Sequence, residues 1–415
     1  MEYSRFDLIV IGGGAAGFFA AVAAKELSPR SSVLILEKSS QLLSKVRISG
    51  GGRCNVTHAC FEPRELVRHY PRGEQQLIAP FSRFQPQDTM EWFANRGIVL
   101  KTEPDGRVFP SSNTSQTIID CLLQEAKTLD VEIRLKAGVK QISLLKERSG
   151  FALFLDSSSQ LIECERLIFA TGSHPHGHAF ATQLGHTICA PVPSLFTFNV
   201  PSSSLSDLAG IAVQEACVEL PSFSLSQTGP LLITHWGFSG PAVLKLSAWG
   251  ARLLHATGYR TEMNINWVPQ FKEQNALNML INFRSKHPNK TLFASNPFGL
   301  PKNLWKRFLD RLNLPTSALL STISNQMLKA LATSLTRDTY LVEGKTTHKE
   351  EFVTCGGVCL NEVNFKTMES RLCPGAFFAG EILDIDGVTG GFNFQNAWTT
   401  GWIAGRTALA GCHTE

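Results

Sequence analysis

The sequence lacks a long uninterrupted apolar run and has little net charge. Charged side chains make up 18% of its 415 residues and sum to +4, which argues against nucleic-acid and acidic-membrane partners. No run of about 18 apolar residues is uninterrupted, so we expect no membrane span. The nearest stretch, residues 8–24, is broken by three glycines and has only Arg5 as a basic flank. A strand, turn and helix explain this stretch better than an export signal.

Metal-binding patterns are also missing. The ten cysteines include no CxxC pair, and the close pair Cys355 and Cys359 has no accompanying histidines, so we expect no zinc site. Without an export signal, the cysteines are expected to be reduced thiols in the cytoplasm. His174, His176 and His178 alternate, and we interpret them as part of a surface loop. The sequence therefore predicts no metal.

A dinucleotide-binding fingerprint is present near the start of the chain. Residues 6–11 form an apolar run of strand length, residues 12–17 read GGGAAG, and residues 15–28 have helical composition. A second buried strand is expected at 33–36, and Glu37 ends it. Strand, glycine turn, helix, strand and acid, in this order, are the context that a βαβ nucleotide site requires.

The positions of this fingerprint have separate roles. Gly12 permits a tight turn, Gly14 leaves room for a pyrophosphate, and Gly17 lets the helix approach the sheet. The helix N-terminus offers free N–H groups to phosphates, and Glu37, 20 residues after Gly17, can accept hydrogen bonds from a ribose. The residues predicted to bind adenine, ribose and pyrophosphate are Gly12, Gly14, Ala15, Ala16, Gly17, Glu37, Lys38 and Val139.

Two further glycine-rich segments suit a flat or anionic ligand. Residues 41–57 are expected to form a polar loop, and residues 380–393 precede a helix expected at 395–410. Glycine-rich backbone before a helix can cradle an anion or a carbonyl group. A buried strand at 167–170 also ends in a glycine turn. The residues predicted to bind the rest of the ligand are Lys45, Ser49, Gly50, Gly51, Gly52, Arg53, Cys54, Asn55, Ala170, Thr171, Gly172, Gly380, Glu381, Asp386, Gly391, Phe392 and Asn393.

The composition changes twice between these segments. Strand patterns form a meander, and after Pro191 the chain becomes β-rich and then helical. Meander strands are expected at 139–145, 151–155 and 161–164, and helices at 241–253, 273–285, 301–312 and 324–334. We predict an α/β fold with a discontinuous Rossmann-like domain (1–190 and 354–415), an inserted β-rich domain (191–268 and 337–353) and a helical subdomain (269–336). The Lys and Arg residues of the helical subdomain are interpreted as solvated faces.

Five segments resemble the HI0933-like flavoproteins, a family that includes BaiN-type reductases and aminoacetone-oxidase-like enzymes. These segments follow the family's order across nearly the whole chain and are residues 45–57, 234–241, 354–358, 367–370 and 380–395. Leu43 and His58 depart from the family pattern, which affects the expected shape of one loop. The resemblance implies that the Rossmann-like domain binds FAD.

The resemblance also implies an FAD-dependent oxidoreductase that acts on a small organic molecule. Only one GxGxxG fingerprint is present, so an NAD(P)H donor would dock transiently. We expect NAD(P)H-linked reduction of a conjugated C=C bond. The alternatives are a flavin amine oxidase and, less favoured by the low charge, a flavin-dependent RNA-modifying or RNA-binding protein. The sequence does not indicate an oligomeric state.

Spacing alone assigns no catalytic residue, but three side chains are weak candidates. His235, beside Trp236, either lines the substrate site or belongs to a β-domain core. Cys54 is either redox-active or a packing residue, and Arg107 either faces an anionic substrate or is an ordinary loop cation. The insertion leaves and re-enters near 170–172 and 354–358, so we expect it to cover the isoalloxazine and to form the substrate cleft.

Overall fold

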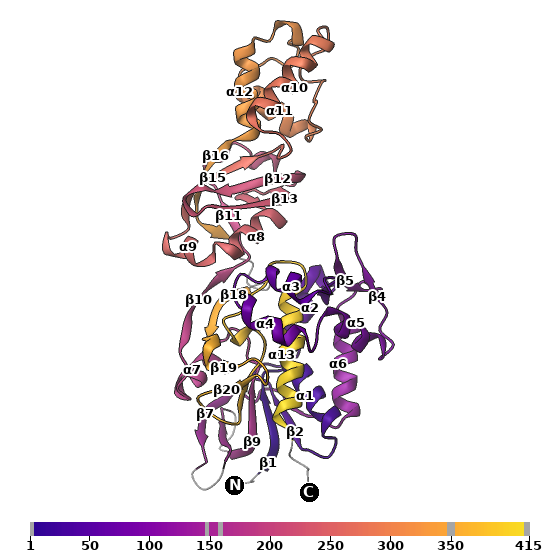
Figure 1. Cartoon of the computed structure of the whole chain (residues 1–415), viewed down its shortest axis with the longest axis vertical. Helices are drawn as coiled ribbons and strands as arrows, with labels where there is room; N and C mark the ends of the chain where they lie inside the picture. Colours follow the sequence, from indigo (N-terminus) through magenta and orange to yellow (C-terminus); the bar gives the residue numbers. More distant parts are fainter. Residues whose placement is uncertain (1–3, 146–148, 157–160, 347–352, 411–415) are drawn as a thin grey trace. The chain divides into compact units, whose positions relative to one another are not determined.

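The structure is a computed structural model that describes residues 4–145, 149–156, 161–346 and 353–410. It divides into two compact units, unit 1 with residues 1–193 and 349–415 and unit 2 with residues 194–348 (Figure 1). Residues 347–352 of the expected inserted domain lie outside the described residues. The finer division of the insertion at 268 and 336 stays a prediction.

The described part of unit 1 is built on a nine-stranded sheet. Seven of its strands follow the order β19-β20-β21-β9-β1-β2-β6, and outside this order β8 pairs with β9 and β7 pairs with β8. The five strands from β21 to β6 are parallel. Its strands are β1 (Ser4–Ile11), β2 (Val33–Leu36), β6 (Glu132–Arg134), β7 (Val139–Leu144), β8 (Phe151–Leu155), β9 (Leu161–Phe169), β19 (Val363–Asn364), β20 (Glu369–Ser370) and β21 (Ala376–Phe378). Smaller sheets contain β3 (Thr57–His58), β4 (Leu100–Thr102), β5 (Arg107–Pro110), β10 (Ile188–Ser194) and β18 (Val353–Val358).

The helices of unit 1 are α1 (Ala15–Leu27), α2 (Ser44–Gly52), α3 (Pro63–Leu66), α4 (Glu74–Phe81), α5 (Pro86–Ala94), α6 (Gln116–Thr128), α7 (Pro175–Gln183) and α13 (Phe392–Ala408). Helices α1 and α13 lie side by side (Figure 1). A Cβ atom at Gly401 or Gly405 would lie only 2.5 or 2.0 Å from the carbonyl oxygen of Ala16 or Ala20. Glycine at these two positions therefore allows the first and last helices to touch backbone to backbone.

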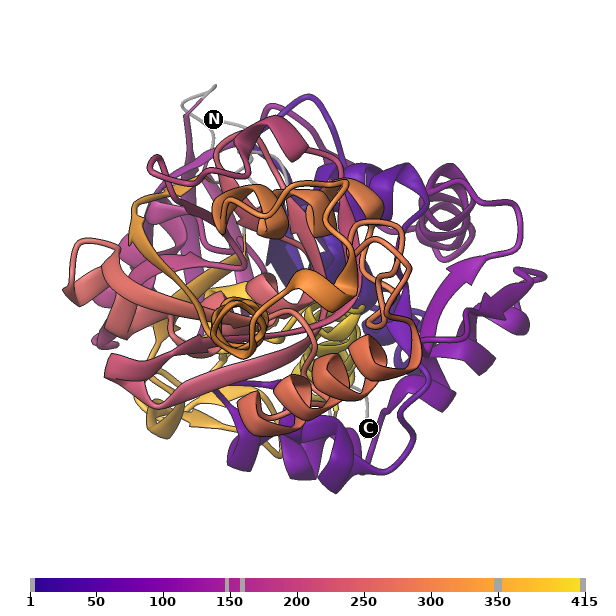
Figure 2. The ribbon, with the colours of Figure 1, turned by 90° about the horizontal axis from the view of Figure 1, so that it is seen from above.

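Unit 2 combines a seven-stranded sheet with helices, as far as its residues are described. Its strands are β11 (Thr197–Asn199), β12 (Ala212–Leu220), β13 (Leu225–Ile233), β14 (Gly237–Ser239), β15 (Arg260–Asn266), β16 (Asp338–Glu343) and β17 (Lys345–Thr346). Its helices are α8 (Pro241–Trp249), α9 (Ala251–Ala256), α10 (Glu273–Lys286), α11 (Lys302–Arg311) and α12 (Asn325–Thr336). Helices α10 to α12 gather at one end of unit 2, and Figure 2 looks onto them from that end.

Three local predictions were wrong. The strands expected at 161–164 and 167–170 are one strand, β9, because its charged residues have partners: Glu165 pairs with Arg5 of β1 at 2.5 Å. The loop expected at 41–57 contains α2, in which Val46 is buried, although Ser49, Gly50 and Gly51 leave helical geometry. The histidine run is not a surface loop, since α7 begins at Pro175 and His178 is buried.

Candidate functional site

The predicted ligand-binding residues meet at one edge of the parallel sheet of unit 1. Strands β1, β2, β9 and β21 end at Ile11, Leu36, Phe169 and Phe378, which are neighbours in register. The chain passes from β1 to β2 on one side and later returns to β9 on the other. Ligands of open α/β sheets bind outside the carboxyl ends of the strands at such a switch point.

The turn after β1 is shaped to receive a phosphate group. Gly14 is the N-cap of helix α1 and provides no side-chain cap, so the first N–H groups of the helix are available to a ligand. A Cβ atom built on Gly14 meets no atom within 4 Å, whereas one on Gly17 would lie 1.9 Å from the carbonyl oxygen of Gly12. Gly14 therefore faces open space, and Gly17 is required for close packing.

Glu37 is fixed in place beside this turn. Its Oε2 accepts a hydrogen bond from Gly13 N at 2.8 Å and its Oε1 accepts one from Ser39 N at 2.8 Å. A carboxylate has further lone pairs, so Glu37 can still accept hydrogen bonds from a ribose. The backbone of Ala137 donates to Glu37 O at 2.9 Å, which brings the start of β7, with Val139, to the same side. Lys38 Nζ is hydrogen-bonded to His174 Nε2.

The end of β9 closes against the same turn. Ala170 N donates to Ile11 O at 2.9 Å, and the space beside Gly12 is filled by the carbonyl group of Ala170. Gly172, with φ of +59°, turns the chain toward α7. His178 of α7 is buried, and its Nε2 has no partner among the described residues. Burial lowers the pKa of His178 despite the opposing influence of the Glu381 carboxylate, so this imidazole is neutral near pH 7.

Residues 49–55 form a tight turn rather than an extended loop. Gly50 and Gly51 have φ of +58° and +68°, and Cys54 N donates to Ser49 O at 3.0 Å. Asn55 holds this turn against the C-terminal segment: with its amide oriented so that donors meet acceptors, its oxygen accepts from Gly391 N at 3.0 Å. Cβ atoms built on Gly51 and Gly52 meet nothing within 4 Å, so this backbone is open to a ligand.

The C-terminal segment 380–393 is held by contacts that connect distant parts of the chain. Lys45 forms an ion pair with Glu381, whose Oε1 also accepts from Thr354 N at 3.1 Å. Asn393 closes its own loop, because its side chain donates to Gly387 O and accepts from Gly387 N, each at 2.8 Å. The ring of Phe392 stacks on the ring of His69, with centroids 4.3 Å apart.

Asp386 is engaged in a buried ion pair. Its side chain is 0% exposed, and Arg72 contacts both carboxylate oxygens, with Nε at 2.5 Å from Oδ1. The carboxylate of Asp386 therefore fixes the segment 380–393 to Arg72, just before α4. Because this carboxylate is already paired, Asp386 would bind a ligand through its backbone. Sequence reasoning missed Arg72, because no local pattern connects residues 314 positions apart.

The three weak catalytic candidates lie in different surroundings. Cys54 is fully buried, and burial raises the pKa of its thiol to about 12, so it stays protonated at neutral pH and is no thiolate nucleophile. Arg107 is paired with Glu103 and Asp105 at 3.0 and 2.7 Å. His235 is exposed in unit 2.

His235 and Trp236 form the tip of the β13–β14 hairpin. Thr234 N donates to Gly237 O at 2.9 Å, which closes the turn around them. Trp236 is 68% exposed, so the interpretation of these two residues as a core pair was wrong. A two-residue hairpin turn leaves both side chains outside the sheet, where they are free to contact a ligand.

Among the described residues, no group of three or more His, Cys, Asp or Glu side chains is placed to hold a metal ion. The Sγ atom of Cys359 lies 2.9 Å from the Sγ atom of Cys189. Within the same described part of the chain, no helix is both long and apolar enough to cross a membrane.

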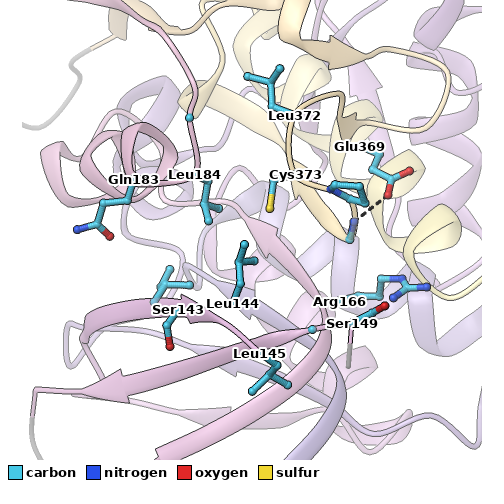
Figure 3. A pocket seen from close by; sticks show the side chains of 15 residues that line it. Ser143, Leu144, Leu145, Ser149, Arg166, Gln183, Leu184, Glu369, Leu372 and Cys373 are labelled. Atoms are coloured by element: carbon cyan, nitrogen blue, oxygen red, sulfur yellow. Dashed lines mark hydrogen bonds between the residues drawn. The ribbon is translucent and has the colours of Figure 1, made fainter. Parts of the chain in front are cut away.

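A pocket of about 820 Å³ lies elsewhere in unit 1 (Figure 3). It is lined by Leu144, Leu145, Leu372, Cys373 and Arg166, among others, and Glu369 at its wall accepts a hydrogen bond from Gly375 N at 2.9 Å. None of the predicted cofactor residues lines it. The cofactor site is therefore assigned from the sheet edge and not from this pocket.

The arrangement at the sheet edge fits FAD. The open space at Gly14 and the uncapped N-terminus of α1 suit the pyrophosphate, and Glu37 suits the adenosine ribose. The turn at 49–55 and the segment at 380–393 provide glycine backbone for the remainder of a long ligand. The assignment of individual residues to parts of FAD stays a prediction.

The model of the HI0933-like protein Rossmann domain matches residues 6–407. The chain is 32% identical to the ribosomal RNA dihydrouridine synthase of Escherichia coli strain K12, over 98% of each chain. It is 29% identical to the 3-dehydro-bile acid delta(4,6)-reductase of Clostridium scindens, over 96% of this chain and 98% of that protein. The 3-ketosteroid-delta4-(5alpha)-dehydrogenase structure from Rhodococcus jostii shares the fold, with 13% identity, 98% of each chain covered and a TM-score of 0.53.

These comparisons confirm the family resemblance and the α/β fold with a Rossmann-like domain that the sequence predicted. They match nearly the full length of the chain, including both parts of the cofactor domain and the insertion. The chain therefore belongs to the HI0933-like family and is an FAD-dependent oxidoreductase.

Proposed function

We propose that this protein reduces a carbon–carbon double bond conjugated to a carbonyl group, with NAD(P)H as the electron donor. The observation that carries the proposal is the full-length match to relatives named for such reductions. The Clostridium scindens relative is named as a reductase of a bile acid, and the Escherichia coli relative as a synthase of dihydrouridine. Dihydrouridine is uridine in which the double bond conjugated to a ring carbonyl has been reduced, so both names describe one bond class.

The residues of this chain would bind and orient the cofactor for that reaction. The N-terminus of α1 and Gly14 would hold the pyrophosphate, Glu37 the ribose, and the segments around Gly50 and Gly391 the flavin end. Bound FAD supplies the hydride chemistry, and the protein supplies position and electrostatics. The neutral imidazole of His178 and the Lys45–Glu381 ion pair lie in the same region, where they would set the charge around the flavin end.

Anaerobic mixing tests the donor. We expect NADPH or NADH to bleach the visible absorbance of the bound flavin, and a conjugated enone or a uridine-containing RNA to restore it without oxygen. Flavin that bleaches with primary amines but with neither nicotinamide would contradict the proposal and support the amine oxidase alternative. A flavin that is reduced by NADPH but reoxidised only by oxygen would contradict the assigned bond class.

The exposed tip of the β13–β14 hairpin is our candidate for substrate contact. We expect His235→Ala to lower turnover at least about tenfold while the FAD content stays unchanged, because a lost hydrogen bond to a reacting or charged group costs about 1.5–3 kcal/mol. The measurement is steady-state NADPH oxidation with the acceptor identified above. His255→Ala is the matched control, since His255 is also an exposed histidine of unit 2. If the two variants had equal turnover, His235 would not contact the substrate and would only be part of the hairpin.

A further inference from the structure

Two thiols that have no place in the predicted cofactor site meet in unit 1. The Sγ atoms of Cys189 and Cys359 lie 2.9 Å apart, although 170 positions separate the two residues in the sequence. Both side chains are half-buried, so a small reagent in solution can reach them. A sulfur–sulfur bond of about 2.05 Å between the two residues therefore requires little movement of either side chain.

The two thiols belong to the two places where the chain leaves and re-enters unit 1. Cys189 lies in β10, whose last residue, Ser194, is the first residue of unit 2, and Cys359 directly follows β18. Strands β10 and β18 form a two-stranded sheet (Figure 1), and Cys359 N donates to Thr187 O at 3.0 Å. A bond between the two sulfur atoms would therefore close a covalent ring that contains all of unit 2, residues 194–348.

Strand β18 also packs against the segment 380–393, which is predicted to hold the flavin end of FAD. A Cβ atom on Gly357 would lie only 2.3 Å from the carbonyl oxygen of Ile382, so only glycine allows this approach. Asp384 N donates to Val358 O at 3.1 Å. Fixing β18 to β10 would therefore act on the strand that is hydrogen-bonded to this segment.

The surroundings of Cys189 suit it to the second step of a thiol–disulfide exchange. Burial, the neighbouring Cys359 thiol and the Asp384 carboxylate raise the pKa of the Cys189 thiol to about 12. This thiol is protonated near pH 7 and is a weak nucleophile toward a disulfide in solution. Toward the sulfur of Cys359, which it already contacts, proximity offsets the small thiolate fraction.

We propose that Cys189 and Cys359 form a reversible disulfide, made by exchange with a low-molecular-weight disulfide of the glutathione class, and that this bond slows the loss of FAD from unit 1. The Cys359 thiolate attacks one sulfur of the small disulfide, forms a mixed disulfide and releases the first small thiol. The Cys189 thiolate then attacks the Cys359 sulfur and expels the second small thiol. The protein loses two protons and two electrons, which reduce the small disulfide to two thiols, and excess small thiol reverses both steps.

The bond would act on FAD retention by restricting local opening. A segment releases a bound group when it opens away from its neighbours, and the segment 380–393 is joined to β18 at Val358 and Asp384. A disulfide disfavours opened conformations because it constrains the chain in them. The inference rests on the binding of FAD by unit 1 and not on which double bond the enzyme reduces.

The test uses the FAD-loaded full chain, oxidised with glutathione disulfide in mildly alkaline buffer, where more thiolate is present. In one portion, the remaining thiols are blocked with N-ethylmaleimide, and mass spectrometry identifies the peptides that carry Cys189 and Cys359. In another portion, FAD release on dilution is followed by the fluorescence of the freed flavin. The variants are Cys189→Ser, Cys359→Ser and, as the matched control, Cys217→Ser, which removes a half-buried thiol of unit 2.

We expect the wild type and Cys217→Ser to form the bond between residues 189 and 359. After oxidation, both should release FAD at least about threefold more slowly than before, because the crosslink disfavours opened states. Treatment with excess reduced glutathione should restore the original rate. Cys189→Ser should instead retain glutathione on Cys359, and Cys359→Ser should acquire none on Cys189; in both variants, FAD release should be the same before and after oxidation.

Other patterns of modification or release would overturn the proposal. A wild type that retains glutathione on Cys359 without forming the internal bond would show that the two sulfur atoms do not meet in solution. An internal bond that leaves FAD release unchanged would remove the link to cofactor retention, and slower release in oxidised Cys359→Ser would assign the effect to another cysteine. These measurements need neither NADPH nor an acceptor, so their failure is distinguishable from a failure of the proposed reduction.

Discussion

Replacing Gly14 with valine is expected to give a folded protein that no longer holds FAD. The backbone of Gly14 has φ of −94° and ψ of −171°, which any residue adopts, and a Cβ atom there meets no protein atom within 4 Å. The valine methyl groups would instead occupy the space assigned to the pyrophosphate. A steric cost of only about 1.4 kcal/mol lowers affinity tenfold, so we expect the affinity for FAD to fall at least tenfold.

Flavin absorbance of the purified variant, with its circular dichroism spectrum, measures this effect. Gly17→Val is the informative comparison, because its Cβ would lie 1.9 Å from Gly12 O and 3.4 Å from a methyl group of Val10. That variant should lose both flavin and structure. A Gly14→Val protein that keeps its full flavin content would refute the placement of the pyrophosphate at the start of α1.

Arg72→Met is expected to destabilise unit 1 by about 3–5 kcal/mol, because it leaves the Asp386 carboxylate buried without its cation. The pair is nearly dry, with side-chain exposures of 12% for Arg72 and 0% for Asp386. The measurement is urea unfolding followed by flavin fluorescence, which reports on unit 1 if FAD binds there. Adding Asp386→Asn to the variant should recover part of the loss, since an uncharged amide is cheaper to bury than a lone carboxylate.

Arg68→Met is the matched control for this prediction. Arg68 lies four residues earlier and pairs with Glu65 at 2.9 Å, but the two side chains are 67% and 55% exposed. Exposed ion pairs contribute about 0–1 kcal/mol, so this variant should unfold close to the wild type. If both variants lost the same stability, burial of the Arg72–Asp386 pair would not be the source of the effect.

The sequence was informative where the chemistry is local. The order of strand, Gly12, Gly14, Gly17 and Glu37 predicted the βαβ unit, because each of these residues has a role set by neighbours within about thirty positions. Helices α10, α11 and α12 were also expected within a few residues of their observed bounds. Apolar periodicity is a strong signal for such elements.

The sequence failed where partners are distant. Nothing near Asp386 indicates that Arg72 will occupy its carboxylate, and nothing near His178 indicates that its side chain will be buried. Two separate strands were expected within 161–170, but they form one strand, in which Glu165 pairs with Arg5 on the adjacent strand. Tertiary contacts decided each of these cases.

The close contact between α1 and α13 has a consequence for the biosynthesis of the protein. Ala16 and Gly401 touch although 385 positions separate them. At about 5–20 residues per second, roughly 20–80 s pass between their emergence during translation. Unit 2 is continuous from residue 194 to residue 348 and is complete before α13 exists. Synthesis of unit 1 therefore begins before that of unit 2 and ends after it. Until α13 is made, the side of α1 that packs against the glycines of α13 stays uncovered.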